Sequence, residues 1–266
     1  MQLKVLTYNT LFAGRDGADT RRAAAQIGLV RELEPDVFLM QEARGFDANG
    51  GSWLYDMEHQ LQMRGFLALA PRTGQHLAIF IRQPLRPLSF ESDPSNFHHS
   101  VASLRVALPG IKQSLHLTSV HLCPNGVDVR RREAAYLAVQ ATPGEYRLLA
   151  GDFNSVSPHD PEPRGFDLLA AHHRIRYAGD GRHADRTVLA TLETAGWVDV
   201  GHLLQPAPTP TVPTAAYTNA EFAQMRCDYV LATPALASKA VGYQVIRTPA
   251  TDSASDHYPV LATFEI

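Results

Sequence analysis

The feature that most constrains the fold is a series of short apolar runs, several of which have a polar residue at one end. Residues 36–41, with the sequence DVFLMQ, form a nearly continuous apolar run, as expected of a strand buried on both faces. Such a strand needs apolar cover on two sides. Further strand-like runs occupy residues 3–8, 77–81, 101–107, 114–122, 147–150, 228–232, 241–246 and 260–264. The pattern therefore predicts a β-rich core that is covered from outside.

Helical patterns lie between these runs. Residues 21–33 carry apolar side chains at near-helical spacing, and Pro35 then stops the helix. Two more helical patterns occupy about 129–140 and 188–195. Because the strands are joined both by helices and by short turns, we expect an α/β protein with two stacked sheets and helices outside.

Composition fits one domain, residues 1–266. With 45% hydrophobic residues, a chain of 266 residues can bury a sizeable core. It has no apolar run near the roughly 20 residues that span a bilayer, and no charged and apolar signal region precedes the first strand-like run. We therefore expect a cytoplasmic protein without a transmembrane segment, while a secreted mature form stays open. Oligomeric state is not readable from the sequence.

Cys123 and Cys227 are too few for a disulfide framework and lack the paired spacing of a zinc site. On extended strands, Cys123 shares a face with His121, whereas Cys227 lies opposite Asp228. A disulfide between them is therefore disfavoured. With a formal net charge of −3, the chain has no general excess of positive charge to hold long nucleic acid. A nuclease, however, needs only local basic contacts around one phosphate.

The polar residues at the ends of the apolar runs define a candidate site. They are Asn9, Glu42, His121, the run 151–154 (GDFN), Asp228 and the run 255–257 (SDH). Hard divalent ions such as Mg²⁺ prefer oxygen ligands, typically one or two carboxylates with substrate phosphate completing the coordination sphere. A lone Glu after a strand is more often a solvated strand end, but the ordered set as a whole indicates a metal site that cleaves phosphoesters.

This ordered set resembles the endonuclease/exonuclease/phosphatase superfamily. The resemblance extends from Leu3 to Ile266 and rests on YN at 8–9, QE at 41–42, SVHL at 119–122, GDFN at 151–154, DY at 228–229 and SDH at 255–257. It implies a four-layer α/β/β/α sandwich, made of two mixed sheets flanked by helices. It also implies hydrolysis of phosphate mono- or diesters with a magnesium-type ion.

The resemblance assigns the metal ligands to Asn9, Glu42 and Asp256. Asn9 would lie beside the ion or orient a metal-bound water, although an Asn also commonly ends a strand through a turn. Mg²⁺ is the expected cofactor, and Mn²⁺ suits the same oxygen ligands.

Asp152 and Asn154 alternate with Gly151 and Phe153, so both polar side chains should point to one face while Phe153 packs on the other. Asp152 is the predicted group that positions or deprotonates the attacking water and later helps protonate the leaving oxygen. The Asn154 amide is predicted to donate to a phosphoryl oxygen. An Asx-rich turn is the alternative explanation.

Two histidines complete the predicted catalytic set. Because a histidine ordinarily titrates near neutral pH, His257 could donate to the phosphoryl oxygens or act as a base. Such a histidine needs an orienting partner, and the resemblance supplies Asp228. His121 is predicted to be a second donor to the scissile phosphate. Some nuclease relatives place an acid that partners this histidine before a central strand, but here Gln75 and His76 occupy that place, which leaves the charge of His121 open.

Two aromatic residues are candidate substrate contacts. Tyr217 follows a Thr/Pro/Ala-rich loop, where relatives keep an aromatic residue beside the substrate. Trp53 either stacks on a base or anchors the start of a helix in the core. The runs 98–99 (HH), 172–173 (HH) and 130–132 (RRR) are expected to be surface features.

Residues 159–186 form an irregular insertion, rich in charged residues, His, Gly and Pro. Loops longer than about 12 to 15 residues are usually functional or disordered. The insertion therefore either caps the site and sets substrate choice or is a solvated surface excursion.

The sequence favours a phosphodiesterase or nuclease that uses in-line attack of water, with DNA or RNA as a candidate substrate. A phosphatase of a small-molecule or lipid-headgroup phosphate is the alternative within the family, since the central residues do not select the substrate. A non-catalytic protein that binds a phosphate ligand is the alternative of another class. Retention of the whole polar set argues against it.

Overall fold

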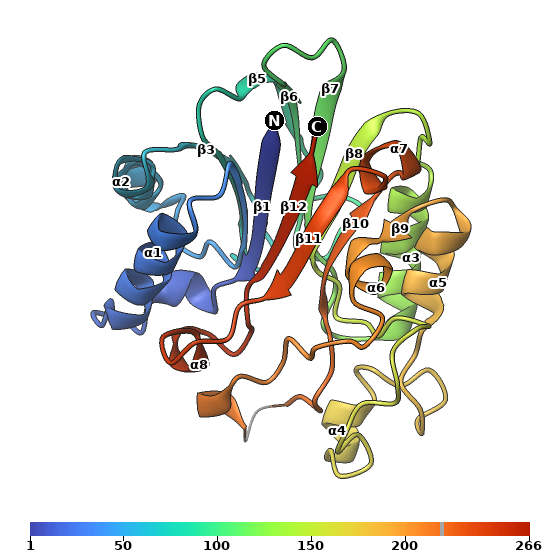
Figure 1. Ribbon diagram of the computed structural model, residues 1–266. Coiled ribbons are helices and arrows are strands. Elements are labelled where there is room, and N and C mark those ends of the chain that lie inside the picture. Colours follow the sequence, from blue (N-terminus) through green and yellow to red (C-terminus); the bar gives the residue numbers. More distant parts are fainter. Residues whose placement is uncertain (219–220) are drawn as a thin grey trace.

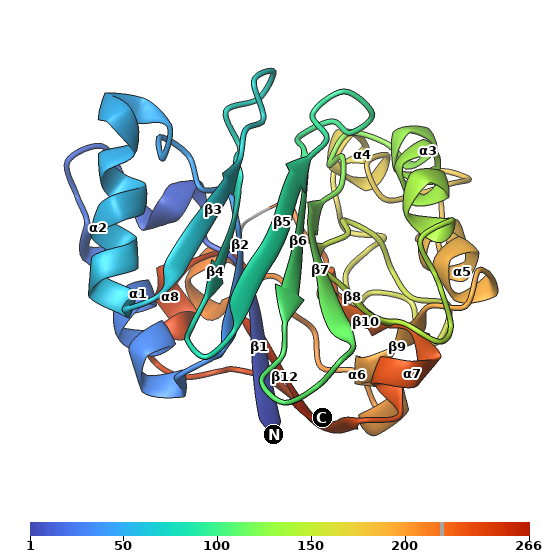
Figure 2. The same cartoon turned by 90° about the horizontal axis from the view of Figure 1, so that it is seen from above.

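Two mixed six-stranded sheets pack face to face, with helices on their outer sides (Figures 1 and 2). The computed structural model describes residues 1–218 and 221–266. The first sheet has the order β11 (Ala240–Val245), β12 (Val260–Glu265), β1 (Gln2–Asn9), β2 (Val37–Gln41), β4 (Leu77–Ile81) and β3 (Arg64–Ala68). The second has the order β5 (Arg86–Ser92), β6 (Val101–Ala107), β7 (Ser114–His121), β8 (Tyr146–Asp152), β10 (Asp228–Ala232) and β9 (Val198–Asp199). The predicted α/β sandwich is confirmed.

Each sheet contains one parallel pair, β1 with β2 and β7 with β8, and its other neighbours are antiparallel. The outer sides carry α1 (Arg21–Leu33) and α2 (Ser52–Leu61) over the first sheet, and α3 (Val127–Ala138) and α5 (Thr187–Thr194) over the second (Figure 2). The shorter helices are α4 (Ala171–Arg174), α6 (Val200–Leu204), α7 (Pro234–Ala237), α8 (Thr251–Ala254), η1 (Phe12–Gly14), η2 (Ala48–Gly51) and η3 (Ala215–Tyr217).

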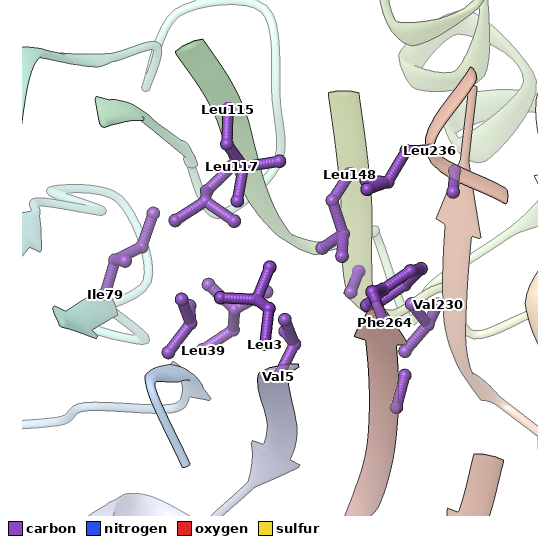
Figure 3. Close-up of a cluster of buried hydrophobic side chains, with 14 of the residues drawn as sticks. Leu3, Val5, Leu39, Ile79, Leu115, Leu117, Leu148, Val230, Leu236 and Phe264 are labelled. Atoms are coloured by element: carbon purple, nitrogen blue, oxygen red, sulfur yellow. The ribbon is translucent and has the colours of Figure 1, made fainter. Parts of the chain in front are cut away.

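Strand β1 shows why the central strands are apolar on both faces. Its residues Leu3 and Val5 belong to the core between the sheets, whereas Leu6 and Tyr8 belong to the core under α1 and α2. Figure 3 shows the first of these cores, where side chains from both sheets meet. Successive side chains of a strand point to opposite faces, and β1 has the second sheet on one face and helices on the other. Both sets of side chains are therefore buried.

Strands β3, β5 and β9 were not predicted, and each lies at an edge of its sheet. No residue of β5 is fully buried, so its sequence lacks the apolar–polar alternation of a strand that buries one face. The short helices α4, α6, α7 and α8 are each only four or five residues long, too short to show a periodic pattern.

The insertion at 159–186 packs against the rest of the chain. Phe166, Tyr177 and Ala184 from the insertion share a small apolar core with Val212 and Met225. Bridges join Arg164 to Gln224 and Ala178 to Ala184. Figure 1 places its helix α4 at the same end of the molecule as α8.

Both cysteines are buried free thiols, as expected. Across the part of the chain that the structure describes, we find no helix with the length and apolar character needed to cross a membrane.

Candidate active site

The candidate site lies where the inner faces of three strands, β1, β7 and β8, end. Leu3 and Val5 face the inter-sheet core, and two further steps of the same alternation lead to Asn9. The same rule leads from Leu117 to His121 on β7 and from Leu148 to Asp152 on β8. Along the inner face of each of these strands, apolar core residues are therefore followed by a polar residue of the site.

Asp152 is the centre of this cluster and is only 1% exposed. Its Oδ2 accepts a hydrogen bond from Asn9 Nδ2 at 3.1 Å and lies 3.4 Å from His121 Nε2 and 3.7 Å from His257 Nε2. Its Oδ1 accepts from the Asn154 backbone N–H at 2.8 Å. Groups from both sheets thus converge on one carboxylate.

Asn9 lies between Asp152 and Glu42. Asn9 Nδ2 donates to Glu42 Oε1 at 3.2 Å, and the Phe12 N–H donates to Glu42 Oε2 at 3.0 Å. Glu42 has a left-handed backbone, with φ of 61°, so the chain turns sharply as β2 ends. Burial and the nearby charge of Asp256 raise the pKa of Glu42 to about 7.

His257 and Asp228 form a buried pair. His257 Nδ1 lies 2.9 Å from Asp228 Oδ2, which directs Nε2 towards Asp152. Burial alone would lower the pKa of His257, but the carboxylates of Asp228 and Asp152 outweigh it and raise that pKa well above its ordinary value. The imidazole is therefore held as the cation.

The surroundings of His121 favour its neutral form, which bears on the question left by Gln75 and His76. Burial, followed by the charges of His257, His98 and Arg176, lowers the pKa of His121 to about 3. Among the described residues its Nδ1 has no hydrogen-bond partner. A neutral ring with its proton on Nε2 still donates a hydrogen bond from that atom.

Asn154 closes the turn after β8 with a φ of 48°. Its Nδ2 donates to the Leu122 carbonyl at 3.0 Å, and this bond ties the turn to the segment that follows His121. Phe153 packs on the opposite side, edge-on against Tyr229, as the alternation predicts. The Asn154 amide thus has a structural hydrogen bond that the sequence did not indicate.

Asp256 and Tyr217 lie at the edge of the cluster. Both are half-buried, and the charge of Asp256 helps to raise the pKa of Glu42 and, after burial, that of Tyr217. Trp53 lies in the first turn of α2, with the Arg15 guanidinium 3.8 Å from its ring centroid and its inner edge against the core under α1 and α2. Of its two predicted roles, these contacts favour the core anchor.

A sequence profile of the Endonuclease/Exonuclease/phosphatase family matches residues 6–257, which is most of the chain. The protein belongs to this family. Membership agrees with the resemblance carried by the polar strand ends. No curated protein matches the sequence.

Solved structures share the fold of this family member at low sequence identity. An AP endonuclease from Archaeoglobus fulgidus is similar with a TM-score of 0.74 and 20% identity, covering 99% of this chain and 100% of that one. D. rerio TDP2 complexed with a single-strand DNA product is similar with a TM-score of 0.71 and 16% identity, covering 100% and 99%. A mannosyl-6-phosphatase from Bacteroides thetaiotaomicron is similar with a TM-score of 0.67 and 16% identity, covering 98% of each chain.

Members of the endonuclease/exonuclease/phosphatase family depend on divalent metal ions, and two groups of residues here suit such an ion. Asp152, Asp228 and His257 each offer a ligand atom within 4.8 Å of the others. However, the 2.9 Å contact between His257 and Asp228 already uses one atom of each in an Asp–His pair. Glu42 and Asp256 form the second group, because the charge of Asp256 helps to raise the pKa of Glu42 and a bound divalent cation would offset that repulsion.

Two buried residues of the site were predicted to be surface features, and both predictions were wrong. The His99 ring stacks on His121 with centroids 4.2 Å apart, and its Nδ1 lies 2.9 Å from Thr73 Oγ1. Arg130 is fully buried on the inner face of α3. The signal for Arg130 was its spacing, because it lies three residues after Val127 and seven before Leu137, on the buried face of the helix.

Arg130 joins three segments around the site. Its guanidinium donates to the Cys123 carbonyl at 2.8 Å, to Ser155 Oγ at 3.1 Å and to the Arg176 carbonyl at 2.6 Å. Glu133, one turn later, accepts from the N–H groups of Cys123 and His98. Helix α3 therefore holds the segments that follow His121 and Asn154, together with the insertion.

Proposed function

We propose that this protein is a metal-dependent phosphodiesterase that cleaves nucleic acid. The observation that carries the proposal is the convergence of Asn9, His121 and His257 on the Asp152 carboxylate, with Glu42 on the far side of Asn9. The proposal is supported because Asp152 could act as a base, His121 and His257 as hydrogen-bond donors and Glu42 as a metal ligand around one small space. Phosphoryl transfer depends mainly on such positioning and on charge stabilisation.

Each side chain has a distinct role in the proposed in-line attack of water on phosphorus. Asp152 accepts the proton of the attacking water as the new P–O bond forms, and that proton then passes to the leaving oxygen as the old bond breaks. His257, kept cationic by Asp228, donates from Nε2 to a phosphoryl oxygen. Neutral His121 donates from its own Nε2, and Asn154 supports Asp152 through its backbone N–H.

The metal ligands would be Glu42 and Asp256, with the side-chain oxygen of Asn9 beside them. A bound Mg²⁺ or Mn²⁺ would neutralise charge on the phosphoryl oxygens during the reaction. Asn9 Nδ2 contacts both Glu42 and Asp152, so it fixes the spacing between the ligand and the base.

Nucleic acid is the favoured substrate class because of two structural neighbours. One is an AP endonuclease, and the other is TDP2 in complex with a single-strand DNA product. The similarity to a mannosyl-6-phosphatase keeps a sugar phosphate monoester as the second candidate. The residues around Asp152 suit either ester, so the choice depends on the rim of the site.

The test is hydrolysis of bis-p-nitrophenyl phosphate, p-nitrophenyl phosphate and supercoiled DNA, each with Mg²⁺ and with a chelator. We expect cleavage of the diester and of DNA that the chelator abolishes. Preference for the monoester would indicate the phosphatase. If a folded, metal-loaded protein binds phosphate but turns over none of the three, the chain is a non-catalytic relative for these substrates and the proposal is wrong.

A further inference from the structure

The insertion at 159–186 brings Arg176 to the rim of the site. Arg176 Nε donates to the carbonyl of Pro124, three residues after His121, at 3.0 Å. Arg130 holds the Arg176 carbonyl from below at 2.6 Å. The charge of Arg176 is near enough to contribute to the lowered pKa of His121, after burial and the other histidines. These contacts fix the arginine beside the His121 side of the cluster.

The other end of the guanidinium reaches towards the His257 side. Arg176 Nη1 forms an ion pair with Glu221, and the next residue, Phe222, lies edge-on against His257 with ring centroids 5.5 Å apart. Phe222 also contacts Tyr177, which follows Arg176. Arg176 therefore lies between Pro124, in the segment that follows His121, and Glu221, whose neighbour Phe222 packs against His257.

The guanidinium keeps capacity for a ligand. Among the described residues, no protein acceptor lies on Arg176 Nη2. The side chain of Arg176 is 18% exposed and that of Glu221 is 52% exposed, so water reaches the carboxylate of the pair and weakens the attraction between the two charges. A phosphate, which accepts two parallel N–H bonds from an arginine, competes well for such a group.

We infer that Arg176 binds a non-scissile phosphate of the substrate, next to the phosphate that is cleaved, and that Glu221 competes with it. The inference rests on the proposed nuclease function and names its substrate as a chain with more than one phosphate. It gives the insertion a role in substrate choice. A polyanion gains from Arg176, whereas a substrate with one phosphate has no group to place there.

The test compares a short oligothymidylate, which has flanking phosphates, with bis-p-nitrophenyl phosphate, which has none. Arg176→Ala should raise KM for the oligonucleotide about tenfold more than KM for the single-phosphate ester, as expected for one lost phosphate contact. The dependence of log KM on log salt should lose about one unit of slope for the oligonucleotide. Arg182→Ala, an exposed arginine of the same insertion, is the matched control and should change neither.

Glu221→Gln separates a binding role from a structural one. If Glu221 competes with phosphate, its neutralisation should lower KM for the oligonucleotide, by up to about fivefold. If the ion pair only braces the rim, Glu221→Gln and Arg176→Ala should both weaken activity. That result, or an equal loss on both substrates, overturns the inference.

A failed nuclease proposal would appear differently, as a wild-type protein that cleaves neither substrate. Binding of a fluorescent oligothymidylate in chelator then decides the role of Arg176 without turnover. Equal affinity and equal salt slope for wild type and Arg176→Ala would overturn it.

Discussion

Asp152 combines three properties that suit a proton acceptor. It is buried, it is contacted by Asn9, His121 and His257, and burial raises its pKa even though His257 opposes the rise. A carboxylate with a raised pKa is a stronger base than an exposed one, so it accepts a proton from the attacking water more readily.

Asp152→Asn should lower kcat at least about a hundredfold, since it removes the proton acceptor and keeps the shape of the side chain. The measurement is hydrolysis of bis-p-nitrophenyl phosphate, with circular dichroism to show that the variant is folded. Full activity in the folded variant would exclude Asp152 as the base.

His99 acts on His121 through ring stacking rather than through a charge. Loss of the ring in His99→Ala should free the His121 imidazole and reduce kcat by about tenfold or more, because small displacements of a catalytic group are costly. His99→Phe keeps a flat ring and should restore most of kcat, with KM and the pH profile close to wild type. Equal loss in both variants would assign the effect to the contact with Thr73 instead.

At the scale of elements, the site depends on how closely β7 and β8 approach. Gly151 pairs with Val120 and has a φ of 145°, and a Cβ atom added there would lie 1.9 Å from the Val120 carbonyl oxygen. The next residues along the two strands are His121 and Asp152, whose distance this approach sets. Helix α3 then fixes both strand ends through Arg130 and Glu133.

Gly151→Ala should therefore destabilise the protein strongly, by about 3 kcal/mol or more, because the clash is with backbone and the conformation is unfavourable for an L-residue. Gly28→Ala is the control, since Gly28 lies in α1 with open space around it and should gain up to about 1 kcal/mol. Urea unfolding of both variants measures the difference. A stable, fully active Gly151→Ala protein would show that the strands can separate without cost.

At the scale of the whole molecule, the site is a source of instability that a bound ion would relieve. The pKa of Glu42 rises from 4.5 to about 7 on folding, so the folded protein binds this proton more tightly than the unfolded chain does. The stability that this proton contributes is present below pH 4.5 and is lost as the pH rises to about 7. Above that pH the ionised Glu42 costs roughly 3 kcal/mol.

Glu42→Gln should therefore be more stable than the wild type at pH 8 in chelator, and the gain should shrink as the pH falls towards 5. Mg²⁺ should raise the stability of the wild type at pH 8, less so at pH 5, where it competes with the proton. It should not stabilise the variant. Urea unfolding of both proteins at the two pH values, with Mg²⁺ or chelator, measures these differences in stability. If Mg²⁺ stabilises both proteins equally, Glu42 is not a metal ligand.

The sequence by itself determined the central strands and which polar residues lie at their ends. Strands buried on both faces read as apolar runs, and the period of two places Asn9, His121 and Asp152 on their inner faces, so local pattern sufficed there. Only the tertiary structure decided which residues support them. His99 and Arg130 belong to the site because loops and a helix distant in sequence pack against it, and Arg176 reaches the rim through the fold of an insertion without periodicity. Contacts between distant segments depend on how the layers pack, which no local period encodes.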